Sequence, residues 1–304
     1  MNAQNSRAKR GKEFSKGLIV DAVAYLAAFA LGALPFSFIG NVFAATAAFT
    51  ATATVVLYVF TVIFSDVSIY DPYWSVAPPV MIAAVMIKYR VFTVNAFILL
   101  ALIALWSLRL TANWLITYKG LGHEDWRYAM YREKCKPFVF QLISFFGLQF
   151  VPTAVVYAGL TGPLFAIREE RFSPLSLFGI ALILGAVLLE FVSDRAIHRF
   201  LREHKGEKKT CDVSVWKYSR HPNYLGELSF WTGLYLYFVA VCPKIFYAGL
   251  WFLTIVFLFL FISIPMMEKH NGERRADYAA YKEKTSVLLL LPPKKKKNRK
   301  NAAK

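Results

Sequence analysis

The chain has 304 residues, of which 57% are hydrophobic and 18% are charged, and its formal net charge is +17. A soluble nucleic-acid-binding protein would not combine this charge with a mean hydropathy of +0.43, whereas a membrane protein with basic loops would. Aromatic residues make up 16% of the sequence, which excludes intrinsic disorder, and three widely spaced cysteines exclude a disulfide scaffold.

Eight apolar stretches follow one another, and a transmembrane helix needs about 20 apolar residues. They are residues 18–39, 42–65, 73–88, 91–116, 138–160, 174–193, 225–242 and 244–266. The third stretch is short and contains Pro78 and Pro79, so it is a candidate for a broken or re-entrant helix. The first is either a signal peptide or, because seven more stretches follow it, a membrane anchor. The sequence therefore predicts an all-α, multi-pass integral membrane bundle with about eight transmembrane helices.

The basic residues predict the orientation of these helices. Thirty of the 36 Lys and Arg residues lie in segments 1–17, 117–137, 194–221 and 267–304. Because basic loops stay in the cytoplasm, eight spans with both termini inside satisfy all four segments, whereas seven spans would divide them between the two faces. We predict a basic cytoplasmic segment (1–17), one membrane-embedded domain (18–293) and a basic disordered tail (294–304). The tail is either a solvated end or a site for anionic lipid head groups.

Several ionisable residues lie in or next to the apolar stretches. An ionised group at mid-membrane costs roughly 3 kcal/mol or more, so such a group usually faces a partner, a wet cavity or the membrane interface. The residues concerned are Asp66, Asp71, Arg109, Glu190, Asp194 and Glu227. On a helix, Trp106, Arg109 and Asn113 share one face, because they are three and four residues apart. An aromatic ring, a fixed cation and an amide on one face suit a phosphate or a carboxylate.

Glu190, Asp194, His198 and Arg202 share another helix face, because each is four residues from the next. The change from acidic to basic side chains along this face suits a ligand that carries hydroxyl and phosphate groups. An ordinary salt-bridged helix next to the membrane would produce the same pattern, so both interpretations stay open.

The densest group of polar residues is the segment 216–227. Pro222 favours an extended or turn conformation before it and can begin the next helix. A helix N-terminus beside Lys217, Arg220 and His221 is an anion site, and Asn223 and Glu227 then lie one turn apart on the new helix. Because the sequence contains no Gly-rich nucleotide motif, this segment, and not a Rossmann fold, would bind a nucleotide.

The motif Ser-Arg-His-Pro-Asn-Tyr-Leu-Gly-Glu at 219–227 resembles the signature of bacterial-type membrane proteins related to the steroid 5-alpha-reductase C-terminal domain, an uncharacterised DUF1295-type group. Further elements of that group occur in order, so the resemblance covers about residues 65–293. They are Asp71–Ser75, Trp106–Arg109 with Asn113, Glu124–Tyr128, Asp194, and Ile264–Glu268 followed by Tyr278, Tyr281 and Thr285.

The resemblance implies a helical membrane enzyme in which NADPH lies in a cytoplasm-facing cavity and reduces a carbon–carbon double bond of a lipid, typically one conjugated to a ketone. Asn223 and Glu227 would contact the cofactor, and Asp194 its adenine or ribose side. The phosphates, ribose or nicotinamide would be contacted by Arg109, Arg220, His221 and Tyr224. The C-terminal segment would close over the nucleotide with Glu268, His270, Tyr278 and Tyr281. Asn113, His198 and Lys217 complete the expected cofactor-binding set.

The substrate side is harder to place. Steroid reductases hold the substrate ketone with a Glu–Tyr pair on early helices, and Asp71 with Tyr73, or Trp74, is the candidate replacement here. A simple turn before a helix would also explain Asp71 and Tyr73. The expected substrate is a lipid or steroid-like small molecule, and no nucleic acid is expected.

Two other functions remain open. Isoprenylcysteine and phospholipid methyltransferases, which use S-adenosylmethionine, share a similar Arg-His-Pro turn and a distal Glu with Tyr-x-x-Tyr. A non-enzymatic lipid-binding scaffold is the third possibility, since lamin-B-receptor-like proteins use a related fold in that way. No metal is expected, because the five histidines lack ligand spacing. A bacterial inner membrane and an endoplasmic reticulum satisfy the orientation equally.

Overall fold

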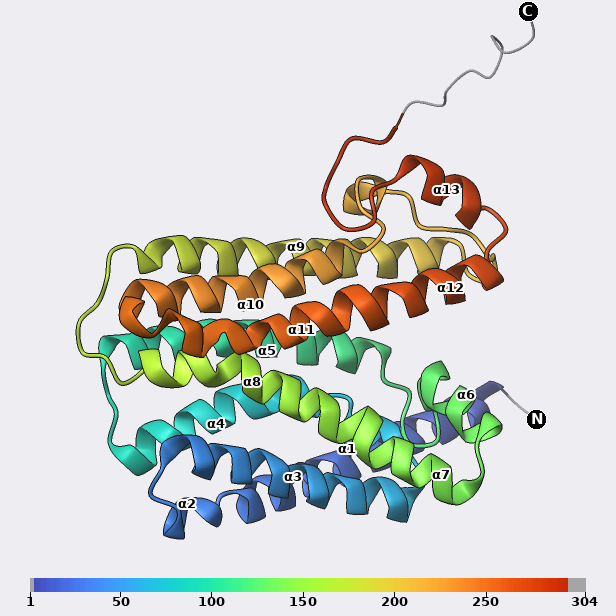
Figure 1. Ribbon diagram of the computed structural model, residues 1–304. Helices are drawn as coiled ribbons and strands as arrows, with labels where there is room; N and C mark the ends of the chain where they lie inside the picture. The colour runs from blue at the N-terminus through green and yellow to red at the C-terminus, as the bar shows by residue number, and fades with distance from the viewer. Residues whose placement is uncertain (1–2, 295–304) are drawn as a thin grey trace, which may run out of the picture. The chain divides into compact units, whose positions relative to one another are not determined.

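The computed structural model describes the backbone of residues 3–294 and the side chains from residue 13 onward (Figure 1). Every regular element in this part of the chain is helical, apart from one isolated bridge between Ser219 and Ser286. The predicted all-α fold class is therefore confirmed. The predicted tail lies outside the described residues, except for Lys294.

The chain divides into two compact units that are interleaved in sequence. The first comprises residues up to Pro174 together with Phe238–Phe252, and the second comprises Leu175–Tyr237 and the residues from Leu253 onward. The expectation of one membrane-embedded domain over 18–293 stays a prediction.

The first unit contains ten helical elements before Pro174, several of them short. They are α1 (Ala3–Gly32), α2 (Pro35–Phe38), α3 (Val42–Phe64), η1 (Val67–Tyr70), α4 (Tyr73–Tyr89), α5 (Val94–Thr117), α6 (Trp126–Lys134), α7 (Pro137–Leu142), the π-helical segment η2 (Ile143–Phe150) and α8 (Val151–Ala166). The 3-10 segment η4 (Pro243–Phe252) packs against α8 and completes the unit. Helix α4 includes Pro78 and Pro79 and continues through both.

The core of the first unit combines alanines with tyrosines. Ala24 and Ala28 of α1 pack with Ala53 of α3, so that the two helix backbones approach closely. Tyr70 and Tyr73 fill the space beside these alanines. Small residues between helices and large aromatic side chains next to them are typical of helix packing in membranes, where tight van der Waals contact replaces the hydrophobic effect.

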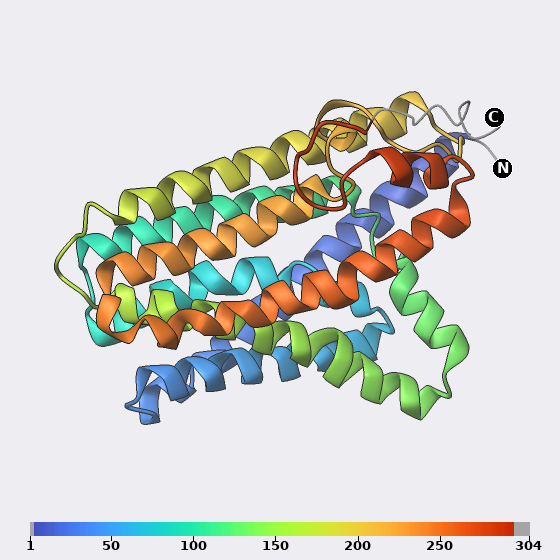
Figure 2. The ribbon, with the colours of Figure 1, turned by 45° about the horizontal axis from the view of Figure 1, so that its top comes forward.

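The second unit is built on two long helices and a C-terminal run of short ones. Its elements are α9 (Ser176–Glu203), η3 (Ser214–Lys217), α10 (Pro222–Val241, whose last turn belongs to the first unit), α11 (Leu253–Leu258), the π-helical segment η5 (Phe259–Ser263), α12 (Ile264–Arg274) and α13 (Tyr278–Lys284). Helices α9 and α10 are antiparallel neighbours (Figures 1 and 2).

Six helical segments of the described chain are long and apolar enough to cross a membrane. They are Glu13–Ser37, Val42–Phe64, Val94–Thr117, Pro137–Ala166, Ser176–Glu203 and Pro243–Arg274, and they coincide with six of the eight predicted spans. The other two predicted spans are also helices, α4 with 17 residues and α10 with 20. The multi-pass membrane bundle is thus confirmed, while eight spans and the cytoplasmic placement of both termini stay predictions.

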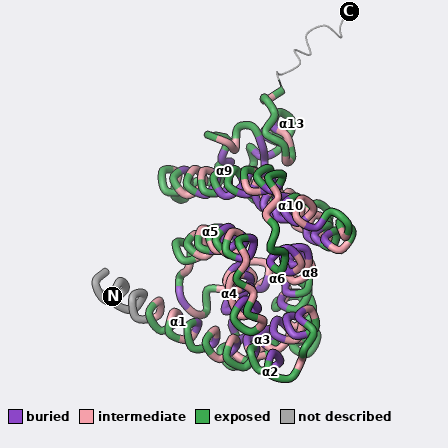
Figure 3. The backbone as a smooth tube through the Cα atoms, turned by 90° about the vertical axis from the view of Figure 1, so that its left-hand side faces the viewer, coloured by how far each residue is buried: buried purple, intermediate pink, exposed green. Residues whose placement is uncertain are grey.

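The outward sides of the long helices are apolar. Exposed residues, green in Figure 3, follow much of α1 and α9. Among them are Leu26, which is 71% exposed, and Leu188, which is 62% exposed. Rows of exposed leucines are unfavourable in water but are what a helix needs where it faces lipid, because the backbone is already satisfied within the helix. The protein is therefore an integral membrane protein.

Glycines allow α9 and α10 to approach each other. A Cβ atom on Gly179 would lie 2.7 Å from the carbonyl oxygen of Gly233, and one on Gly233 would lie 2.6 Å from Cγ1 of Ile183. Both distances are too short for a real Cβ atom, so only glycine fits at these two positions. The second unit therefore depends on the absence of side chains at these two positions.

We predict that Gly233→Ala lowers the stability of the protein by about 1–3 kcal/mol, because the new methyl group overpacks the contact between α9 and α10. The measurement is the melting temperature in detergent. Gly185→Ala is the matched control, since nothing lies within 4 Å of a Cβ atom at Gly185 on α9. It should leave the melting temperature unchanged or raise it, because alanine favours helix by about 1 kcal/mol. Equal effects of the two changes would contradict the prediction.

Candidate functional site

The turn before α10 is held in an extended conformation by the C-terminal segment of the second unit. The backbone N–H of Arg220 donates to the carbonyl of Ser286 at 2.8 Å, and the Ser219 hydroxyl donates to the carbonyl of Leu288 at 2.7 Å. The same hydroxyl oxygen accepts from the backbone N–H of His221 at 3.1 Å. Pro222 then begins α10, as the sequence predicted. These bonds fix the direction of the Arg220 and His221 side chains.

The polar side chains around this turn contact a single carboxylate, that of Glu268. Oε2 of Glu268 accepts from Nη1 of Arg220 at 2.6 Å and lies 3.3 Å from Nζ of Lys282. Oε1 accepts from the Tyr278 hydroxyl at 2.6 Å and lies 2.9 Å from Nε2 of His221. We call these five residues the Glu268 cluster. Because the Arg220 and His221 side chains are 5% exposed and Glu268 is 11% exposed, the cluster is largely shielded from water.

Helix α13 covers the turn and is itself anchored by Asp277, the residue just before its first turn. The carboxylate of Asp277 accepts from the backbone N–H and the hydroxyl of Thr210, which holds the pKa of Asp277 below its ordinary value. The Tyr281 hydroxyl lies 2.6 Å from the carbonyl oxygen of Trp216 and 3.2 Å from that of Ser219. Burial raises the pKa values of Tyr278 and Tyr281, so both phenols stay protonated and act as donors.

The first turns of α10 carry the other predicted cofactor residues. The ring of Tyr224 stacks on that of His221 with centroids 5.3 Å apart. Glu227 is buried, and its Oε1 accepts from Nε1 of Trp231 at 2.8 Å. A Cβ atom on Gly226 would lie 2.3 Å from Cγ of Glu190, so the buried Glu190 of α9 lies directly against α10.

Two buried polar atoms at the site have no hydrogen-bond partner among the described residues. They are Nε of Arg220 and the hydroxyl oxygen of Thr285. A buried donor without a partner costs about 1–3 kcal/mol, so proteins usually satisfy it with water or a ligand. Because Arg220 also belongs to the Glu268 cluster, its free Nε indicates where a polar ligand would bind.

The structure unites only some of the predicted cofactor residues. Arg220, His221, Glu268 and Tyr278 meet at one carboxylate, and Tyr281 covers the same turn. Elsewhere in the second unit, Lys217 lies on η3 over the Tyr218 ring, Asn223 on the first turn of α10, Asp194 and His198 on α9, and His270 beside Arg274 on α12. Arg109 and Asn113 lie on α5, which belongs to the first unit.

Lys282 was absent from the residues proposed from the sequence. Its ammonium group nevertheless contacts Glu268. The signal was present, because Lys282 is four residues after Tyr278 and therefore lies on the same face of α13. The anchor between Thr210 and Asp277 gave no such signal, since 67 residues separate the two and neither has a motif around it.

In the first unit, the carboxylates of Asp66 and Glu124 connect the segment around η1 with the loop before α6. The carboxylate of Asp66 accepts from the backbone N–H groups of Ser68 at 2.9 Å and Gly122 at 2.6 Å. Glu124 accepts from the N–H of Val67 at 2.9 Å and pairs with Arg132 at 2.6 Å. A structural role for Asp66, in which its carboxylate holds the turn, accounts for these contacts.

Asp71 has a phenol partner, but the partner is not the one that the sequence suggested. The hydroxyl of Tyr128 donates to Oδ1 of Asp71. The hydroxyl of Tyr73 instead donates to the carbonyl of Thr50 at 3.2 Å. Burial raises the pKa of Asp71 to about 7, although the Tyr128 hydrogen bond and the charge of Arg127 oppose the shift.

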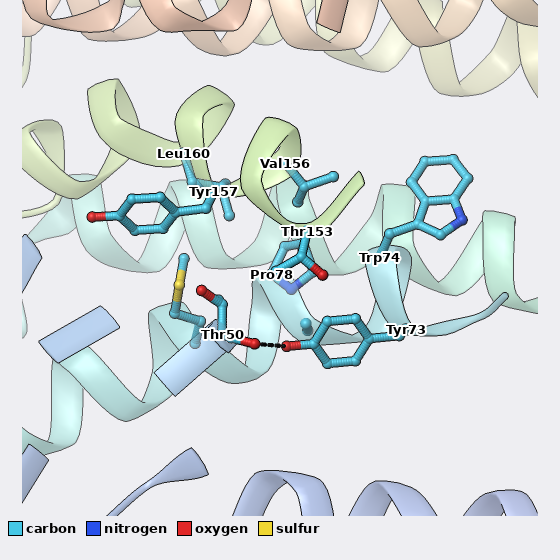
Figure 4. A pocket seen from close by; sticks show the side chains of 10 residues that line it. Thr50, Tyr73, Trp74, Pro78, Thr153, Val156, Tyr157 and Leu160 are labelled. Atoms are coloured by element: carbon cyan, nitrogen blue, oxygen red, sulfur yellow. Dashed lines mark hydrogen bonds between the residues drawn. The ribbon is translucent and has the colours of Figure 1, made fainter. Parts of the chain in front are cut away.

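Tyr73 and Trp74 line a narrow, mostly apolar pocket of the first unit (Figure 4). Thr153 also lines the pocket, and its hydroxyl lies 2.8 Å from those of Tyr70 and Thr54, which do not line it. The remaining lining residues are Thr50, Ala77, Pro78, Met81, Val156, Tyr157 and Leu160. Two of the three predicted substrate-side residues thus lie at one pocket, and Asp71 lies at the end of η1, just before α4.

We predict that stability falls as the pH rises towards neutrality, in part because of Asp71. The folded-state pKa of about 7 exceeds the ordinary value of 3.8, so the stabilising effect of the protonated carboxyl is complete below about pH 4 and is lost through about pH 7. In melting curves recorded between these pH values, Asp71→Asn should flatten the slope relative to the wild type. An unchanged slope would show that Asp71 ionises normally.

We also predict that Glu268→Gln destabilises the protein by about 3 kcal/mol, because it leaves the buried Arg220 charge without its counter-ion. The melting temperature in detergent reports the loss. Glu273→Gln on the same helix is the control, because that side chain is 64% exposed and lies 3.9 Å from Lys269. Its effect should stay within about 0.5 kcal/mol. A Glu268 variant as stable as the control would refute the central role of this carboxylate.

Comparison with known proteins agrees with the motifs at this site. An uncharacterised protein of Schizosaccharomyces pombe, C594.04c, is 25% identical over 174 residues, which are 49% of this chain and 50% of that protein. The chain thus spans about half the length of this curated relative. No solved structure matches. The family model for a protein of unknown function, DUF1295, matches residues 57–285, and the chain therefore belongs to the DUF1295 family.

Proposed function

We propose that this protein is a membrane-embedded, NADPH-dependent reductase of a carbon–carbon double bond in a lipid or steroid-like enone. The observation that carries the proposal is the Glu268 cluster, in which a buried arginine keeps one donor, Nε, without a partner beside the N-terminus of α10. Belonging to the family does not decide the reaction, since the function of DUF1295 proteins is unknown.

The charge around the cluster favours a polyanionic ligand. Arg220 and Lys282 bring two fixed positive charges to one carboxylate, that of Glu268. The segment 194–221 adds an excess of four positive charges, with eight Lys and Arg against four acidic residues. NADPH carries several phosphate charges, whereas the sulfonium group of S-adenosylmethionine is a cation. The local field therefore attracts the former more strongly.

The chain offers donors and acceptors of the kind that NADPH would need. Arg220 through Nε, together with Lys217, would hold phosphate, as cationic donors do at a helix N-terminus. Asn223 and Glu227, one turn apart on α10, would bind ribose hydroxyl or carboxamide groups. When bound, NADPH supplies the hydride for the reduction.

The substrate side of the proposal rests on the first unit. The pocket beside Tyr73 and Trp74 is lined mostly by apolar side chains, as the hydrocarbon part of a lipid requires, but it encloses space for only about one water molecule, so a lipid would have to open it. Asp71, with a pKa of about 7, is protonated in part at neutral pH and is the acidic group in this region best suited to deliver a proton.

A methyltransferase is the second candidate, because Arg220, Glu268, Tyr278 and Tyr281 fit its motif equally well. Asn223 and Glu227 separate the two proposals, since they belong to the reductase-like pattern. A lipid-binding scaffold without catalysis is the third, and it would need no ligand at Nε of Arg220.

The decisive experiment measures the melting temperature of the detergent-solubilised protein with NADPH and with S-adenosylmethionine. We expect NADPH to stabilise the wild type, by about 2.7 kcal/mol at a hundredfold excess over its Kd. Asn223→Ala and Glu227→Gln should lose this gain while expression stays normal, and Glu273→Gln, on the exposed side of α12, should keep it. Stabilisation by S-adenosylmethionine alone would favour the methyltransferase, and stabilisation by neither compound would favour the scaffold.

A further inference from the structure

The segment after α13, residues 285–294, is an irregular strap that bends at 287–289 and is bonded to the turn before α10. Three bonds join it to the turn: one from the Arg220 N–H to the Ser286 carbonyl, one from the Ser219 hydroxyl to the Leu288 carbonyl, and one from the Leu291 N–H to the Tyr218 carbonyl at 3.2 Å. The Leu291 N–H is shared with the carbonyl of Leu289 at 2.9 Å. The strap is therefore fixed to the residues that carry the Glu268 cluster.

The strap is fixed by its backbone, yet its apolar side chains are largely uncovered. Leu289 is 57% exposed and Leu291 is 51% exposed, and Val287 and Leu290 are also exposed. Tyr218, which bonds to Leu291, adds a further exposed ring. Several large apolar side chains exposed within one short segment are unfavourable in water and mark an interaction surface.

The sequence beyond the strap indicates what covers this patch. Seven of the eleven residues in Lys294–Lys304 are Lys or Arg, and none is acidic. An apolar patch directly followed by a basic run combines the two signals that hold a segment at an anionic lipid surface. The strap itself cannot enter the hydrocarbon, because its irregular backbone would leave polar groups unsatisfied there.

We propose that the strap and the basic tail together bind the surface of an anionic lipid bilayer. The leucines would contact the boundary between head groups and acyl chains, while the lysines would neutralise acidic head groups. Because the strap is hydrogen-bonded to Tyr218, Ser219 and Arg220, this binding also holds the turn of the Glu268 cluster in place. It does not depend on which reaction the protein catalyses.

Hydrogen–deuterium exchange of the full chain in nanodiscs tests the proposal. One set of discs contains phosphatidylcholine alone, and in the other about a third of the lipid is phosphatidylserine. In the anionic discs we expect the amides of 286–291 and 218–221 to exchange about tenfold more slowly, and high salt should remove the difference. Equal exchange in both kinds of disc would overturn the proposal.

Two sets of variants separate the charge from the apolar contact. Lys295→Gln with Lys296→Gln and Lys297→Gln should abolish the slower exchange. The matched control replaces Lys205, Lys208 and Lys209 with Gln, which removes the same charge from an exposed loop of the second unit and should keep it. Leu289→Ser with Leu290→Ser should reduce the difference. Retention of the full difference by either tail or strap variant would be evidence against this surface.

A protein partner would give a different result. The strap would then exchange slowly in discs made directly from native membranes, but not in discs of defined lipids, whatever their charge. That outcome would overturn the proposal in favour of a protein-binding strap.

Discussion

The second unit depends on one buried carboxylate. Glu268 cannot stay ionised away from water unless cations and donors surround it, because the cost of desolvating a charge is several kcal/mol. The partners come from two places in the chain, the turn at Arg220 and His221 and helix α13 with Tyr278 and Lys282, so Glu268 joins both to helix α12. The need to satisfy this charge therefore holds the turn before α10, helix α12 and helix α13 together. Packing of the long helices alone would not fix the positions of these three elements.

The same constraint shapes what the site can bind. Glu268 engages Nη1 of Arg220 and leaves Nε inside the protein without a partner. A guanidinium held in this way is preorganised, so a ligand does not have to order it. Since Lys282 is 57% exposed, the cluster also keeps one cation within reach of solvent. A polyanion can thus be attracted by the exposed charge and bound by the buried one.

Much of this arrangement could be predicted from the sequence, because it depends on residues that are close together in the chain. Runs of apolar residues predicted the helices, and the motif around Pro222 placed Arg220 and His221 at a helix start. Pairings across long stretches of chain left no such trace. Asp71 and Tyr73 are neighbours in sequence, but Asp71 bonds to Tyr128, 57 residues away. Local spacing cannot identify such a partner, because the fold brings the two residues together from distant parts of the chain. Their separation in sequence follows no helical or strand repeat.

Three acidic groups of the two units are satisfied in different ways. Asp66 is satisfied by backbone N–H groups, Asp71 by a phenol, and Glu268 by cations and a phenol. Backbone donors are part of the fold and cannot be withdrawn, so Asp66 is suited only to hold a turn. Side-chain donors can be exchanged for ligand atoms or lose their proton. Of the three acids, Asp71 and Glu268 therefore have partners that a ligand could replace, and the strap is bonded to the turn that carries Arg220, the partner of Glu268.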